Sequence, residues 1–101
     1  MFKHIVLWRV ATESEGRDQA SLIAEVESRL RALPAQIPEI REFEVGRNVK
    51  SSEFAADVAL YSAFDDEAAF DRYVVHPAHQ EAGGFIGGVV TDRRVVDYLT
   101  D

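Results

Sequence analysis

The sequence contains no cysteine, and its 101 residues include only three prolines, one tryptophan and one methionine. A chain without cysteine forms no disulfide and offers no thiol as a nucleophile or metal ligand. This composition fits a reducing compartment, and we expect a cytoplasmic protein. No long apolar run follows the first residues, so no secretory leader is expected. No segment approaches the roughly 20 apolar residues that span a bilayer.

Positive charge is also scarce. The chain has 11 Lys and Arg against 18 Asp and Glu, which gives a formal net charge of −7 at pH 7. The cations are scattered along the sequence, whereas a protein that binds a phosphate backbone needs a basic face. We therefore expect neither nucleic acid nor a membrane among the partners.

Apolar residues are plentiful, at 47% of the chain, and the length suits one domain over residues 1–101. Residues 2–10 read as a strand that is apolar on both sides, with Ile5 and Leu7 alternating with Val6 and Trp8. If helices cover one side of the sheet, the other apolar side remains exposed to solvent unless a partner subunit covers it. The pattern therefore predicts a homodimer.

The remaining periodicity completes an α+β fold. The pattern predicts six elements, in chain order: a strand over 2–10, a helix over 17–33, strands over 40–49 and 54–64, a helix from the acidic residues 65–67, and a strand over 89–99. The order β-α-β-β-α-β is the ferredoxin-like arrangement, a four-stranded antiparallel sheet with helices on one face. Two such sheets facing each other across a two-fold axis would form a dimeric α/β barrel.

Four glycines interrupt the pattern before the last strand, at positions 83, 84, 87 and 88. Each costs about 1 kcal/mol relative to Ala inside a helix. We therefore predict at most a short helical piece after Pro77, followed by a loose linker anchored by Phe85 and Ile86. A mobile flap is the alternative. The segment lacks the Lys and hydroxyl residue of a phosphate-binding loop.

Two of the three histidines lie three residues apart around a proline, at His76 and His79. Three interpretations remain open. The pair can bind a metal, with His4 or Asp97 as a third ligand. One histidine can be a general base held by Tyr73 or Asp97. Alternatively both are structural, with His76 capping a helix end and His79 hydrogen-bonded to the backbone.

His4 and Asp97 lie on the first and last predicted strands, where a carboxylate can fix the tautomer and orientation of an imidazole. That pair serves either catalysis or the structure alone. Aromatic residues can also wall a pocket between sheet and helices, although an ordinary core explains them equally well. These aromatic residues are Trp8, Phe70, Tyr73 and Phe85.

Five segments in the same order resemble the stress-responsive A/B barrel (Dabb) domain, and the resemblance covers essentially the whole chain. The segments are residues 3–8, Leu33-Pro34 with residues 37–40, residues 57–64, Tyr73 with residues 76–79, and residues 95–98. The resemblance implies the ferredoxin-like fold and a dimeric α/β barrel.

The resemblance also implies a candidate site. One plant branch of the family consists of polyketide cyclases that form olivetolic acid by a metal-free aldol cyclisation. Their working Tyr and His match Tyr73 and His79, and a strand-one His and last-strand Asp match His4 and Asp97. We expect these four residues to be catalytic. Four further residues are expected to contact the ligand: Trp8, Phe70, His76 and Phe85.

The leading hypothesis is thus a cofactor-free cyclase or isomerase activity on a small hydrophobic or phenolic ligand, with His79 as base and Tyr73 steadying the oxyanion. A non-catalytic binding or stress-stabilising protein is the alternative. A cofactor-independent monooxygenase is the third hypothesis, since some dimeric ferredoxin-like barrels have that activity.

Overall fold

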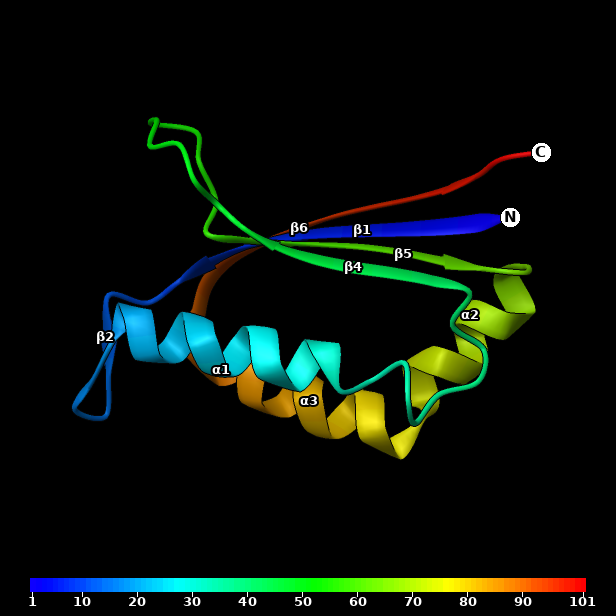
Figure 1. The fold of residues 1–101 in the computed structure, drawn as a ribbon, viewed down its shortest axis with the longest axis horizontal. Helices are drawn as coiled ribbons and strands as arrows, with labels where there is room; N and C mark the ends of the chain where they lie inside the picture. Colours follow the sequence, from blue (N-terminus) through cyan, green and yellow to red (C-terminus); the bar gives the residue numbers. More distant parts are fainter.

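The structure, a computed structural model, describes all 101 residues. A four-stranded antiparallel sheet in the order β4-β5-β1-β6 carries three helices on one face (Figure 1). The main elements are β1 (Phe2–Val10), α1 (Gln19–Arg31), β4 (Glu42–Arg47), β5 (Val58–Phe64), α2 (Glu67–Val75), α3 (Pro77–Val89) and β6 (Val90–Leu99). The predicted ferredoxin-like order is confirmed, with a second helix in the last crossover.

β1 lies at the centre of the sheet, between β5 and β6. Its even-numbered residues face the helices and are buried, among them His4, Val6 and Trp8. The odd-numbered residues face the open side, where Leu7 is 42% exposed. Because a strand alternates its side chains, one sequence builds both the core and an uncovered apolar face.

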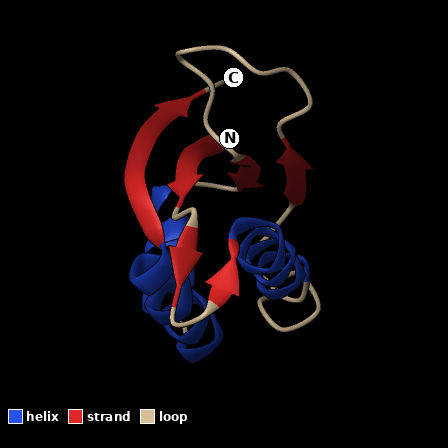
Figure 2. Cartoon of the chain, turned by 90° about the vertical axis from the view of Figure 1, so that its left-hand side faces the viewer, coloured by secondary structure: helices blue, strands red, loops and turns tan.

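α1 begins at an N-cap, where the Asp18 carboxylate accepts a hydrogen bond from the Ser21 backbone N–H at 2.9 Å. Leu22, Val26 and Leu30 recur every four residues and are buried against the sheet. The helix begins two residues later than predicted because Arg17 and Asp18 form β3 (Arg17–Asp18), and it ends at Arg31 rather than at Leu33. β3 pairs with β2 (Glu13–Ser14) in a small hairpin (Figure 2).

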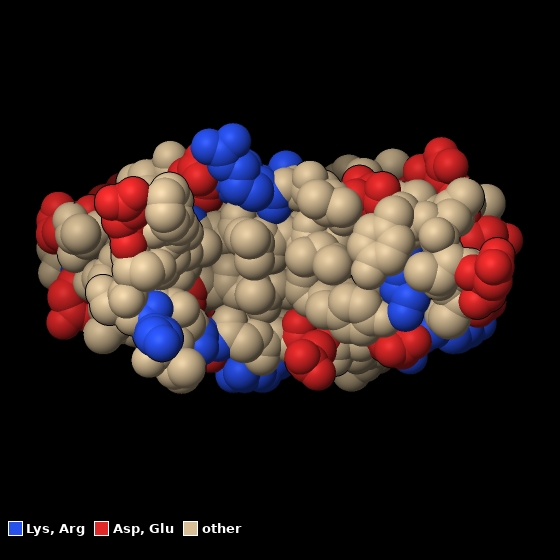
Figure 3. Space-filling view, turned by 90° about the horizontal axis from the view of Figure 1, so that it is seen from above, with Lys and Arg blue, Asp and Glu red and all other residues tan.

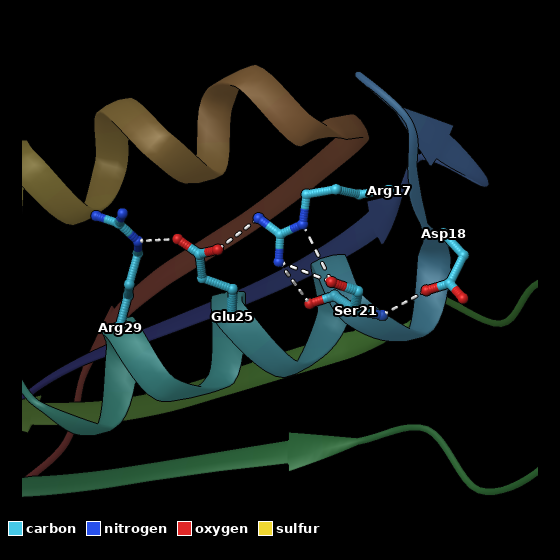
Figure 4. Close-up of polar contacts among 5 residues, drawn as sticks. All are labelled: Arg17, Asp18, Ser21, Glu25 and Arg29. Atoms are coloured by element: carbon cyan, nitrogen blue, oxygen red, sulfur yellow. Dashed lines mark hydrogen bonds and ion pairs between the residues drawn. The ribbon is translucent and has the colours of Figure 1, made fainter.

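Polar contacts fix α1 relative to its neighbours (Figure 4). Glu25 accepts from the Arg17 guanidinium at 2.5 Å and from Arg29 Nε at 2.8 Å. These two bonds hold the pKa of Glu25 below its usual value. The Arg29 guanidinium also lies 4.4 Å from the centre of the Phe85 ring on α3. The network therefore links the β3 end of the hairpin, α1 and α3.

β4 is an edge strand, as predicted from its half-exposed alternation. Both strands of the β4–β5 hairpin are shorter than predicted, so the connection covers residues 48–57 rather than the 50–53 left between the predicted strands. This loop rises above the sheet on the side away from the helices (Figure 1). It carries Val49, 97% exposed, and Phe54, 86% exposed.

The predicted glycine linker is wrong: residues Pro77–Val89 form α3, a continuous helix of 13 residues. Proline occupies its first turn, where the missing N–H costs nothing. Ala82, Ile86 and Val89 anchor the helix in the core. Burial of this apolar stripe outweighs the unfavourable helix propensity of the four glycines. None of the three helices has the length and apolar character needed to cross a membrane.

Candidate functional site

A cavity of about 220 Å³ lies between the sheet and the helices. It is mostly apolar, with four polar side chains: His4, Tyr73, His79 and Arg93. The remaining lining residues are Val6, Trp8, Leu30, Leu33, Leu60, Ala82, Gly83, Ile86, Gly87 and Val90. Drug-sized ligands occupy pockets of about 300–1,000 Å³, so this cavity suits a smaller molecule.

A single residue, His76, separates α2 from α3, and the bend there brings a side chain of each helix into contact. His76 has extended backbone, with φ −64° and ψ 135°, because the following proline disfavours helical geometry. Its Nδ1 accepts a hydrogen bond from the Ala78 N–H at 3.0 Å and caps α3. Tyr73 in the last turn of α2 and His79 in the first turn of α3 then meet, with ring centres 4.4 Å apart.

His79 is half-buried, and its Nδ1 lies 3.0 Å from the Val74 carbonyl oxygen. A carbonyl only accepts, so Nδ1 carries the proton and Nε2 of the neutral ring has a free lone pair. Burial lowers the pKa of His79, and the bond to Val74 opposes this shift. Positive charge on His4, and after it on Arg93 and His76, lowers the pKa further. The imidazole is therefore neutral at pH 7 and able to accept a proton.

Tyr73 is 1% exposed, and its hydroxyl has no hydrogen-bond partner within the chain. No fully buried side-chain polar atom lacks a partner, so this hydroxyl reaches the cavity rather than the packed core. Burial raises the pKa of Tyr73 far above its usual value, while the Arg93 charge acts in the opposite direction. The phenol stays protonated and remains available as a hydrogen-bond donor.

His4 and Asp97 face each other in the register of β1 and β6. His4 Nδ1 and Asp97 Oδ1 are 2.5 Å apart, so the carboxylate accepts the Nδ1 proton and fixes the orientation of the ring. The His4 ring is 5% exposed, and its centre lies 6.4 Å from that of Tyr73. The structure therefore brings His4, Tyr73 and His79 to one cavity, with Asp97 orienting His4.

Three of the residues expected to contact a ligand lie outside the cavity lining. Phe70 stacks on Phe2 and packs against His4, with ring centres 4.6 and 4.8 Å apart. Phe85 packs against Arg29, and His76 caps α3. Trp8 does line the cavity.

The sequence analysis named only four of the fourteen lining residues as candidate site residues, and three of those it missed bear on the chemistry or the shape of the cavity: Arg93, Gly83 and Gly87. The signal for Arg93 was the alternation on the last strand, which places it on the same side as Asp97. The two glycines were missed because the segment was predicted to be a linker. No group of three or more His, Asp or Glu residues is arranged to hold a metal ion, so the geometry does not support the metal-binding interpretation.

These features define a ferredoxin-like α+β protein with a small, largely apolar cavity that holds acid–base side chains. Residues 2–100 match the family described as the stress responsive A/B barrel (Dabb) domain. The chain belongs to this family.

Relatives confirm the fold. An uncharacterised protein of Streptomyces coelicolor is 41% identical over 80 residues, which cover 79% of this chain and 80% of that protein. A dimeric ferredoxin-like protein of unknown function from Bacteroides fragilis superposes with a TM-score of 0.84 at 34% identity, covering 96% of this chain and 93% of that one. The hydroxynitrile lyase of Passiflora edulis has a TM-score of 0.82 at 19% identity, covering 99% and 93%, which shows a shared fold alone.

Proposed function

We propose that this protein binds a small carbonyl compound with an aromatic or otherwise apolar body and performs cofactor-free acid–base chemistry on it. His79 is the base and Tyr73 the hydrogen-bond donor. The observation that carries the proposal is that the His79 and Tyr73 rings lie 4.4 Å apart between centres at one mostly apolar cavity.

The step is a proton transfer next to a carbonyl. His79 Nε2 takes a proton from the carbon beside the carbonyl, and the electron pair of that C–H bond moves onto the carbonyl oxygen as an enolate. The Tyr73 hydroxyl donates a hydrogen bond to the developing oxyanion. The enolate carbon then either attacks a second carbonyl of the same molecule, which closes a ring and gives an alkoxide that takes the proton back from His79, or, in an unsaturated ketone, the extended dienolate takes that proton at its far carbon, which is an isomerisation. His4, held by Asp97, lines the same cavity.

The test uses proton exchange, because exchange needs only the first half of the reaction. The neutral ketone 4-hydroxyacetophenone is incubated with the protein in D₂O, and loss of its methyl proton signal is followed by NMR. We expect exchange above the buffer rate. His79→Gln should abolish the enhancement, and Tyr73→Phe should reduce it by about 10²–10³-fold, as for loss of an oxyanion donor.

Tyr98→Phe is the matched control, because Tyr98 loses the same hydroxyl but lies on the open face of the sheet, opposite Lys3. Its exchange rate should equal that of the native protein. An unchanged rate in His79→Gln, or no enhancement in the native protein, contradicts the proposed chemistry.

A non-catalytic ligand-binding protein is the second candidate. The observation that favours it is that His79 and His76 both bond to the backbone, as structural histidines do. In that case His79→Gln lowers the free energy of unfolding while the protein shows no exchange activity at any pH.

We further propose that the whole chain acts as one domain and assembles as a homodimer through the open face of the sheet. Uncharged side chains run along the centre of this face, with Lys, Arg, Asp and Glu towards its margins (Figure 3). Leu7, Val96 and Tyr98 are 42%, 59% and 40% exposed there. The similar protein from Bacteroides fragilis is dimeric, which supports the proposal.

A further inference from the structure

Arg93 is a cation without a partner at the cavity. It lies on the helix-facing side of β6, opposite Trp8, and lines the cavity with Tyr73 and His79. Its neighbour Arg94 has an ion pair, with Nε 3.2 Å from Asp92 Oδ2. Arg93 itself has no hydrogen bond or ion pair within the chain, so its guanidinium donors are free for another group.

The cavity holds nothing that neutralises this charge. No Asp or Glu is among its lining residues, although the chain has a net charge of −7. The nearest candidates on the same strand are already occupied, because Asp92 pairs with Arg94 and Asp97 with His4. A positive charge without a partner is therefore present at this cavity in an otherwise acidic protein.

The Arg93 charge reaches the reacting groups as well. Arg93 lines the same cavity as Tyr73 and His79, and its charge acts to lower the pKa of both. A ligand held by Arg93 therefore shares this cavity with the base and the hydrogen-bond donor. The rest of the wall next to Arg93 is apolar, including Trp8 and Val90.

We infer that Arg93 binds a carboxylate of the ligand, so that the natural substrate is a small organic acid, with its carbonyl presented to Tyr73 and His79. A guanidinium matches a carboxylate with two parallel N–H donors, and one positive charge balances one negative charge. A phosphate monoester, with nearly two negative charges, would require further cations that the cavity lacks. This inference rests on the proposed function in that it places the ligand in the same cavity.

The test uses two probes of the same shape, benzoate and neutral benzamide. Trp8 is the only tryptophan of the chain and lines the cavity, so its fluorescence reports binding. For the native protein we expect benzoate to bind at least about ten-fold more tightly than benzamide, the difference expected for a charge-assisted hydrogen bond. Arg93→Gln should remove that preference. Arg93→Lys should retain part of it, since Lys keeps the positive charge but lacks the two parallel N–H donors of the guanidinium.

Arg72→Gln is the control. It removes the same charge from an exposed side chain of α2 that pairs with Glu39, and the benzoate preference should persist. Arg93→Gln should melt at the native temperature, because Arg93 has no partner to lose.

Three results overturn the inference: equal affinity of the native protein for both probes, an unchanged preference in Arg93→Gln, or no binding of either probe. Its failure is distinguishable from failure of the proposed chemistry, since exchange of the neutral ketone needs no carboxylate. Exchange without benzoate preference overturns only the role of Arg93. Benzoate preference without exchange overturns only the acid–base chemistry.

Discussion

At the scale of single residues, the protonation states of two rings follow from where the chain places them. His79 is kept neutral mainly by burial, and its Nδ1 proton is held by the Val74 carbonyl. Tyr73 is kept as a phenol by burial. Both shifts favour the uncharged form, because an apolar cavity disfavours charge whatever its sign.

The depressed pKa of His79 makes stability depend on pH. Its unfolded pKa is about 6.5, and its folded pKa lies lower. As pH falls below about 6.5, the unfolded chain binds this proton before the folded chain does. The free energy of unfolding therefore decreases as the pH decreases. Denaturant unfolding between pH 5 and 7.5 should therefore show a steeper acid loss in the native protein than in His79→Gln, in which Gln can still donate to Val74. Parallel pH profiles for the two proteins would show that His79 has an ordinary pKa.

The sequence predicted a residue contact correctly where the strand order of the fold places two residues side by side. The His4–Asp97 contact was predictable because the first and last strands of this fold pair, and one register sets them opposite each other. Arg93 was not identified, because an isolated Arg on a strand carries no motif. Only the three-dimensional cavity shows that its side chain lacks a carboxylate partner.

At the scale of elements, α3 enlarges the cavity because two of its lining residues are glycines without side chains. Gly83 and Gly87 are one turn apart and line the cavity, whereas Gly84 and Gly88 do not. A Cβ added at any of the four would meet no atom within 4 Å. Glycine at 83 and 87 therefore leaves space that a side chain would otherwise fill.

Alanine substitution separates these two pairs. The double variants Gly83→Ala/Gly87→Ala and Gly84→Ala/Gly88→Ala should each gain up to about 2 kcal/mol of stability, since each Ala adds up to about 1 kcal/mol of helix propensity. Thermal unfolding measures this gain. Only the first pair adds methyl groups to the cavity, so only the first should weaken benzoate binding. Equal binding by both variants would show that α3 does not limit the cavity.

The same helix marks the limit of the sequence prediction. The order of the four long strands and the start of α2 at its acidic residues were predictable, because alternation and capping are local signals, although the ends of β4 and β5 and the small β2–β3 hairpin were not. The extent of α3 was not, since its glycines oppose helix formation locally. Burial of Ala82 and Ile86 against other elements decides the outcome.

At the scale of the whole molecule, the apolar open face and the raised loop 48–57 lie on the same side of the sheet (Figure 1). The loop projects the exposed Phe54 and Val49 beyond that face. A second copy facing this surface would cover the sheet and meet the loop. The helices and the cavity would remain on the outside of the assembly.

Lysine substitution at two equally exposed valines tests this arrangement. Val96 is 59% exposed on the open face, and Val75 is 64% exposed at the end of α2. Native protein and Val75→Lys should sediment at twice the 11.3 kDa chain mass. Val96→Lys should raise the dimer dissociation constant at least about 100-fold, because it buries an unpaired charge. A dimeric Val96→Lys, or a monomeric native protein, contradicts the proposed interface.

Arg93, Val95 and Asp97 alternate along one side of β6, which is an edge strand, and all three are exposed. Of the three, only Arg93 both lines the cavity and lacks a partner within the chain, whereas Asp97 holds the buried His4. Arg93 is therefore free of the packing constraints that govern Val6 or Leu60 in the core, and a mutation there alters the chemistry offered to a ligand with little penalty in folding. Divergence of ligand preference among descendants of such a chain is expected to concentrate at this position of the last strand, while the scaffold stays unchanged.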